Sequence, residues 1–417
     1  MTVGGESKGD RGMSGDHRPP RVLIYSHDSF GLGHLRRCRA IAHAMCEDNE
    51  ELSVLILSGS PIIGSFDFRS RVDFVRVPGV IKLRNGEYTS LTLPMAIEDA
   101  IEMRASIIRH TAEVFDPDIM LVDKEPSGLR GELSETLEVM KQRGTHIVLG
   151  LRDVLDDPLQ LRAEWKRKNA AAALEEYYDE IWVYGLPQIC EPLDGIELAA
   201  STRRKTTYTG YLQRFADTQT VSELPFIKRD DPFILVTPGG GGDGEELVDW
   251  VLRAYESDSS LPHRSVIVLG PFMQSDRRAE FIARTDKLSK VEAITFDAHM
   301  ESLMVKAIAV VAMGGYNTFC EILSFDKRAL IVPRTEPRRE QLIRASRAAE
   351  LGLLTMLRGD DDRKADVMAT ALRHLPQQDP PSRSVVPGLM AGLENVNILT
   401  RRALGLKKRP SLARKRA

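Results

Sequence analysis

The feature that most constrains the fold is an apolar run that ends at two glycines and continues as a helix. Residues 308–313 have the composition of a buried parallel strand, and Gly314 and Gly315 follow directly. Such a junction presents bare backbone N–H groups at the carboxyl edge of a sheet, which predicts an anion site. The alternative is an ordinary βαβ unit whose glycines allow close packing, and the two glycines alone favour it. Thr318 and Glu321 on the following helix, however, are placed to reach the same crevice, which indicates a nucleotide-sugar pocket.

Strands and helices alternate along the whole chain, and the pattern occurs twice. In the first half we expect strands at 21–26, 53–57, 72–77, 118–122, 146–149 and 180–183, and helices at 35–45, 96–114, 132–142 and 158–178. In the second half we expect strands at 232–236, 265–269, 291–295, 308–312 and 329–332. The alternation predicts an α/β protein of two facing, doubly wound, Rossmann-like domains with the active site in the cleft between them.

Polar segments and the ends of the periodic pattern set the expected boundaries. These are a disordered leader at 1–20, an acceptor-side domain at 21–215, a linker at 216–231, a nucleotide-sugar-binding domain at 232–385, a C-terminal helix at 386–405 and a basic tail at 406–417.

Composition excludes several classes of protein. A net charge of −3 over 417 residues gives no general attraction to nucleic acid, so no nucleic-acid partner is expected. The four cysteines form no CxxC pair, which argues against a zinc cage and favours a reducing compartment. The sequence contains no apolar run of membrane-spanning length and no signal peptide, so we expect a cytoplasmic protein. The stretch 401–417 has eight Lys or Arg and no acid; a solvated tail is favoured over peripheral contact with an anionic membrane.

A glycine-rich loop follows the first strand of each domain. The loop 239–244, GGGGDG, lacks the lysine of a Walker motif. Its glycines are predicted to bring backbone amides close to a diphosphate; they are Gly239, Gly240, Gly241 and Gly242.

The loop of the first domain carries Gly31 and Gly33 and then His34 at a helix start. The helix N-terminus should lower the pKa of this histidine, so that the neutral imidazole can accept a proton. A helix cap is the other interpretation, and residue chemistry alone leaves both open.

The Asp-Pro-Asp sequence at Asp116 and Asp118 resembles a metal-binding DxD motif. It precedes a strand rather than following one, which places it at the wrong edge of the sheet. We therefore interpret it as an Asp-Pro turn and expect no metal site.

Three segments of the second half together resemble the C-terminal domain of family 28 glycosyltransferases. They are Phe296-Asp-Ala-His-Met300, Met313-Gly-Gly-Tyr-Asn-Thr-Phe-Cys-Glu321, and Pro333 with Arg339-Glu-Gln341. The turn Gly210-Tyr-Leu-Gln-Arg214 resembles the family's GNPxR turn, and the Gly31 loop its GxGGH loop. The resemblance covers about 200 residues closely and about 350 loosely.

The resemblance implies a role for each matching residue. Phe296 would lie by the base, Glu321 would bind the ribose, and Thr318, Gly314 and Gly315 would lie near the phosphates. Arg214 would meet the diphosphate, and Glu340 with Gln341 would hold the donor sugar. The family has two glutamines where this chain has Glu340 and Gln341, which leaves the sugar open.

The function so implied is that of a GT-B hexosyltransferase that needs no cofactor or metal and inverts the anomeric centre. It would move a sugar, expected to be a UDP-linked hexose or HexNAc, to a glycan, lipid-linked or small-molecule acceptor. His34 would be the base, with Asp28 and Asp153 on the acceptor side. A nucleotide-sugar epimerase or hydrolase that uses Asp28, Asp153 and Glu340 is an alternative. Another is a non-catalytic sugar-nucleotide-binding protein.

Overall fold

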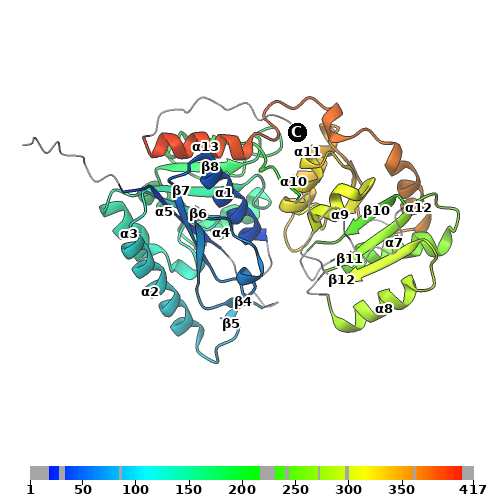
Figure 1. Ribbon diagram of the computed structural model, residues 1–417, viewed down its shortest axis with the longest axis horizontal. Helices are drawn as coiled ribbons and strands as arrows, with labels where there is room; N and C mark the ends of the chain where they lie inside the picture. Colours follow the sequence, from blue (N-terminus) through cyan, green and yellow to red (C-terminus); the bar gives the residue numbers. More distant parts are fainter. Residues whose placement is uncertain are drawn as a thin grey trace, which may run out of the picture.

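The computed structural model describes residues 18–27, 33–83, 87–216, 231–239, 244–270, 273–295, 300–359 and 363–405. Within this part of the chain, two large parallel sheets carry helices on both faces and form two domains side by side (Figure 1). The predicted fold class, two doubly wound Rossmann-like domains, is confirmed.

The first domain is built on a seven-stranded sheet of order β3-β2-β1-β6-β7-β8-β9, in which every pair is parallel. The strands are β1 (Arg21–Ser26), β2 (Ser53–Ser58), β3 (Val72–Arg76), β6 (Ile119–Asp123), β7 (His146–Arg152), β8 (Glu180–Tyr184) and β9 (Thr206–Tyr208). A short antiparallel hairpin, β4 (Val80–Lys82) and β5 (Tyr88–Ser90), stands apart from this sheet. Runs such as β6 are buried along their whole length, because helices cover both faces of a parallel sheet.

The second domain has a six-stranded sheet of order β12-β11-β10-β13-β14-β15, again parallel throughout. Its strands are β10 (Phe233–Thr237), β11 (Arg264–Leu269), β12 (Val291–Thr295), β13 (Ala309–Ala312), β14 (Arg328–Ile331) and β15 (Thr355–Met356). The chain reverses direction across this sheet between β10 and β13, which is where ligands bind in open α/β sheets.

The helices of the first domain are α1 (Gly33–Asp48), α2 (Ile97–Phe115), α3 (Ser134–Gln142), α4 (Pro158–Arg167), α5 (Ala170–Tyr177) and α6 (Ala200–Arg203). Those of the second are α7 (Glu245–Ser257), α8 (Ser275–Thr285), α9 (Met300–Lys306), α10 (Tyr316–Ser324), α11 (Glu340–Glu350) and α12 (Ala365–His374). The single helix expected at 158–178 is two helices, because Asn169 between them has a positive φ of 50°.

The last helix, α13 (Gly392–Ala403), returns to the first domain and packs beside α1 (Figure 1). Asn395 donates to the carbonyl of Thr209 at 2.8 Å, and Arg401 pairs with Asp48 at the end of α1. A helix was expected at 386–405, but not its position on the other domain. The linker 217–230 and the tail 406–417 lie outside the described residues. Of the expected leader, residues 18–20 are described, and Arg18 pairs with Asp116 and Asp118 at 3.1 and 3.0 Å.

Candidate active site

The site lies where the first helix of one domain meets α10 of the other. Helix α1 begins directly beyond β1, and α10 begins directly beyond β13, so both start at the carboxyl edge of a sheet. Asn317 on α10 donates through Nδ2 to the carbonyl of Gly33 at 3.1 Å, which brings the two helix starts together across the domains.

His34, in the first turn of α1, is bonded through Nδ1 to a carboxylate oxygen of Asp123. Asp123 is the last residue of β6, the strand beside β1, so the pairing follows from sheet order. Arg37, one turn further along α1, donates to Asp123 Oδ1 from Nε at 2.9 Å and from Nη2 at 2.6 Å. The side chains of Arg37 and Asp123 are almost fully buried, whereas that of His34 is 17% exposed. The result is a histidine held by a buried carboxylate that an arginine keeps ionised.

Burial favours the neutral form of His34. Burial lowers the pKa of His34 below its ordinary value of 6.5, although Asp123 acts in the opposite sense. Burial would raise the pKa of Asp123, but Arg37 and His34 outweigh it and hold that pKa far below the ordinary range. An ionised carboxylate only accepts hydrogen bonds, so Nδ1 carries the imidazole proton and Nε2 keeps its lone pair. The expected direction of the His34 shift agrees with the structure, but its main cause is burial rather than the helix N-terminus.

Asp123 was missed by the sequence analysis, which ended this strand at Val122. Its signal was an acid at the carboxyl end of a strand, a position that faces ligands in α/β sheets.

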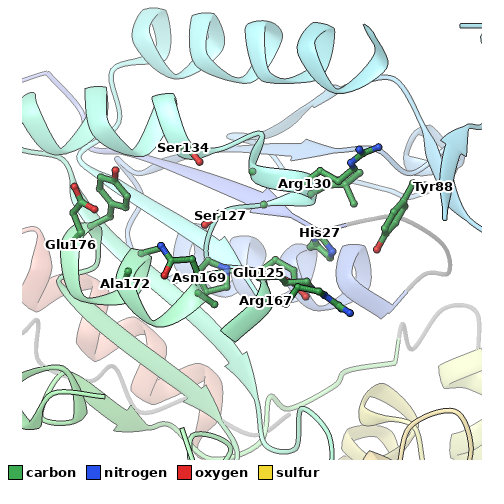
Figure 2. Close-up of a pocket in the computed structure, with 18 of the residues that line it drawn as sticks. His27, Tyr88, Glu125, Ser127, Arg130, Ser134, Arg167, Asn169, Ala172 and Glu176 are labelled. Carbon is green, nitrogen blue, oxygen red and sulfur yellow. The ribbon is translucent and has the colours of Figure 1, made fainter. Parts of the chain in front are cut away.

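A cavity of about 940 Å³ opens at the same edge of the first domain (Figure 2). Its walls come from separate segments: His27 after β1, Tyr88 of β5, the loop 125–131 after β6, and the junction 167–173 of α4 and α5. His27 also stacks edge to face on His34, with ring centroids 5.7 Å apart, so the cavity adjoins His34. The segments that line the cavity are far apart in the sequence, so no local sequence pattern predicted it.

The two glycines of the second domain have different roles. Gly314 has φ of +81°, and a Cβ there would lie 2.8 Å from the Ile331 side chain, so glycine is needed for conformation and close packing. Gly315 caps α10, and an added Cβ would meet nothing within 4 Å among the described residues. Close packing therefore explains Gly314, whereas the backbone at Gly315 is open to an approaching group. Thr318, one turn further on, is partly exposed.

Glu321 is 2% exposed and accepts from Arg36 Nη2 at 2.5 Å. The same nitrogen is paired with Glu301 of α9, so one guanidinium from the first domain bridges two carboxylates of the second. Burial raises the pKa of Glu321, with Arg36 acting against it. Glu321, the residue expected at the ribose, is thus a buried carboxylate that shares the guanidinium of Arg36 with Glu301.

Three other expected donor residues are engaged by neighbours. Arg214 donates from Nη2 to Asn317 Oδ1 at 2.8 Å and lies between the two domains. Glu340 accepts from Arg334 Nη2 at 2.6 Å, and Gln341 accepts from the Arg334 backbone N–H at 3.1 Å. A second cavity, of about 470 Å³, lies against the same segment and is lined in part by Glu245, Met313 and 332–336.

Asp153, expected on the acceptor side, is fully buried between the domains instead. Its carboxylate accepts from Arg344 of α11 at 2.7 and 2.6 Å and from the Tyr211 hydroxyl at 2.7 Å. It lines neither cavity. A carboxylate with three strong donors and no exposure fastens the domains and does not meet a ligand.

Several expected site residues lie outside the described part of the chain, namely Asp28, Gly31, Gly240, Gly241, Gly242 and Phe296. Within the described ranges, there is no group of three or more His, Cys, Asp or Glu side chains suited to a metal ion. None of the described helices combines the length and apolarity needed to cross a membrane.

Comparison with known proteins identifies the second domain. The model of the glycosyltransferase family 28 C-terminal domain matches residues 239–379. No curated protein matches the sequence. Among solved structures, a UGT transferase from Siraitia grosvenorii in complex with UDP is 15% identical, with a TM-score of 0.60 over 92% of this chain and 99% of that one.

Two further solved structures have the same fold. MurG of Acinetobacter baumannii is 12% identical, with a TM-score of 0.56 over 92% of this chain and all (100%) of that one. CalG4, the calicheamicin glycosyltransferase, is 12% identical, with a TM-score of 0.55 over 93% and 95%. At such identities the likeness shows the fold, while the family model shows the domain. The chain therefore has the GT-B fold, and residues 239–379 of its second domain match the C-terminal domain of family 28 glycosyltransferases.

Proposed function

We propose that this protein transfers a sugar, carried as a UDP-linked hexose or HexNAc, to an acceptor hydroxyl with inversion at the anomeric carbon. The single observation that carries the proposal is the pair formed by His34 and the buried Asp123 at the edge of the first domain. A neutral imidazole oriented by a carboxylate is a general base, and it faces the family 28 domain, whose relatives hold nucleotide sugars.

The reaction is a single displacement. The acceptor oxygen attacks the anomeric carbon while Nε2 of His34 takes its proton, and the bond from that carbon to the diphosphate oxygen breaks. The electron pair leaves with the nucleoside diphosphate. Asp123 stabilises the imidazolium that forms, because its carboxylate already accepts the hydrogen bond from the Nδ1–H group of His34. Attack opposite to the leaving group inverts the centre.

The donor is proposed to lie along the carboxyl edge of the second sheet. In this assignment the base meets Phe296, the ribose meets Glu321, and the sugar meets Glu340 and Gln341. The diphosphate would contact Arg214 and the backbone amides of a set of neighbouring residues. These residues are Gly239, Gly240, Gly241, Gly242, Gly314, Gly315 and Thr318. The open backbone at Gly315 supports this assignment.

The acceptor is proposed to occupy the cavity of about 940 Å³, because its wall residue His27 touches the ring of His34. Main-chain amides and the dipole of α10 would balance the charge of the leaving diphosphate, so we propose that no metal is needed. Turnover in EDTA equal to turnover in magnesium is the expected result. An epimerase or hydrolase gains no support, since Asp153 and Glu340, two of its three expected carboxylates, are tied to arginines.

The test compares His34→Gln with His43→Gln, a second α1 histidine that accepts from the Arg69 backbone N–H and lines neither of the two cavities described above. A thermal-shift screen of UDP- and dTDP-sugars first identifies the donor, since a ligand that binds only the native state raises the melting temperature. His34→Gln should then lower turnover by about 10²–10⁴-fold with UDP affinity unchanged, and His43→Gln should change neither. Normal turnover in His34→Gln would remove His34 as the base. UDP binding without turnover against any acceptor would favour a binding protein.

A further inference from the structure

A second histidine, His27, lies at the boundary between the cavity and His34. It follows β1 directly, is 5% exposed, and lines the cavity of the first domain (Figure 2). Its ring meets that of His34 at 79°, with centroids 5.7 Å apart. The mechanism proposed above gives it no part, and its position was not anticipated from sequence.

A buried network behind His27 decides which of its nitrogens carries the proton. Arg104 donates to both oxygens of Glu132 at 2.6 and 2.7 Å, so both oxygens act as hydrogen-bond acceptors. Tyr25 uses its single hydroxyl proton on Glu132 Oε1, at 2.6 Å. The Tyr25 oxygen therefore only accepts from its other neighbours, the Leu129 backbone N–H at 3.2 Å and His27 Nδ1 at 3.3 Å.

His27 is accordingly the Nδ1–H tautomer, with a lone pair on Nε2. Burial lowers its pKa well below 6.5, and Lys124 adds to that shift, so the ring is neutral at physiological pH. Among the residues that the structure describes, the hydrogen-bond partner found for the His27 ring is Tyr25, at Nδ1.

The two adjacent histidines thus have the same arrangement. Each has Nδ1 fixed by a buried, arginine-held network, Asp123 for His34 and Tyr25 with Glu132 for His27. Each therefore offers an unprotonated Nε2 that needs a hydrogen-bond donor. One hydroxyl has one proton and can serve only one of them.

Resting on the function proposed above, we infer that His27 positions the acceptor by accepting a hydrogen bond from the hydroxyl next to the one that reacts at His34. The acceptor is then a molecule with two neighbouring hydroxyls, that is, a sugar or another polyol. Hydroxyl oxygens on adjacent carbons lie about 2.8 Å apart, close to the length of one O–H···O hydrogen bond, so one molecule can reach two rings in contact. A monohydroxylated acceptor would lack the second hydroxyl, so it could not donate this hydrogen bond to Nε2 of His27.

The first arm of the test reads the tautomer in the full-length protein labelled with ¹⁵N-histidine. The His27 resonances are assigned with His27→Asn. A neutral Nδ1–H ring at pH 7.5 is expected, and it should become a tautomer mixture in Tyr25→Phe but not in Tyr255→Phe, a buried tyrosine of the second domain bonded to Ser265. An Nε2–H or protonated His27 would overturn the inference.

The second arm uses cis-1,2-cyclohexanediol and cyclohexanol as probes with UDP present. The diol should shift His27 Nε2 and bind about twofold to tenfold more tightly than the mono-alcohol, and His27→Phe should bring the ratio close to one. Equal shifts from both probes, or no shift from the diol, would overturn the inference. UDP titration in the same samples separates this result from the proposed function. Absent UDP binding would count against the donor site and leave the His27 result intact.

Discussion

Two buried aspartates at the ends of neighbouring strands differ in the groups to which they are hydrogen-bonded. Asp123 ends β6 and Asp153 follows β7, and each buried carboxylate accepts hydrogen bonds on both oxygens from one arginine. Asp123 binds Arg37 of its own domain and also the partly exposed His34. Asp153 binds Arg344 of the other domain, the buried Tyr211 hydroxyl and the Val154 backbone N–H.

In the proposed mechanism, the partner beyond the arginine decides the role of each carboxylate. Asp123 would orient the base His34, whereas Asp153, whose partners are all internal, would hold the two domains together. Removing the carboxylate of Asp123 should therefore change different measured quantities from removing the carboxylate of Asp153.

The largest combined effect is expected for Asp123→Asn. The amide can present an N–H to His34 and stabilise the wrong tautomer, so turnover should fall by about 10²–10⁴-fold. Arg37 would also be left buried without its counter-charge, which should cost about 3–5 kcal/mol of unfolding free energy. Turnover per folded molecule and urea denaturation on the same preparation measure both effects. A loss of stability with unchanged turnover would mean that Asp123, like Asp153, stabilises the fold and does not orient a base.

Asp153→Asn should show only the second effect. Burial of Arg344 without its carboxylate should lower the unfolding free energy by about 3–5 kcal/mol, while the folded fraction keeps near-normal turnover at saturating substrates. Glu350→Gln is the matched control, because Glu350 pairs with Arg347 on an exposed helix face and such pairs contribute about 0.3–0.5 kcal/mol. A hundredfold loss of turnover in Asp153→Asn, with the fold intact, would restore it to the active site.

Sequence reasoning reached the fold because the alternation of apolar strands and helices repeats, and both sheets were confirmed. It named Asp153 as a site residue and missed Asp123, although Asp123 directly follows the strand predicted at 118–122. The difference lies in their arginines, 86 residues away for Arg37 and 191 for Arg344, and no local pattern reports such pairings. His27 was overlooked for the same reason, because Tyr25 is bonded to Glu132, which lies 107 residues away.

Glu321 offers a third, intermediate case. It is buried like the two aspartates, but it shares Arg36 with Glu301, and burial raises its pKa. We expect a ribose hydroxyl to bond to this under-compensated carboxylate. Glu321→Ala should weaken UDP binding by about 1.5–3 kcal/mol, or tenfold to somewhat above a hundredfold. Glu301→Ala loses the same arginine contact without the expected ribose contact, so its UDP affinity should change little. An unchanged dissociation constant for Glu321→Ala in calorimetry would count decisively against the pocket.

The smallest expected effects concern pH, and they follow from the direction of each shift. The pKa of His34 lies below 6.5, so the acid limb of kcat/KM should also lie below pH 6.5. In the unfolded chain the pKa values of the histidines are near 6.5. As the pH falls, the unfolded chain therefore binds protons before the folded protein does. The stability that His34 and His27 contribute as neutral rings is thus complete above pH 6.5, is lost as the pH falls below it, and stops changing below their folded pKa values.

Asp123 acts in a separate, more acidic window. Its pKa is depressed, so its contribution is complete above its ordinary value of 3.8 and is lost only as the pH falls from there toward the folded value. Urea denaturation at pH 7.5 and 5.5 isolates the histidines, and His34→Gln should lose less stability between those two values than the natural chain. An equal loss in both would mean that His34 carries the same proton count folded and unfolded. The imidazole would then not be held neutral by burial, and the ordinary pKa of a solvated histidine would govern the reaction.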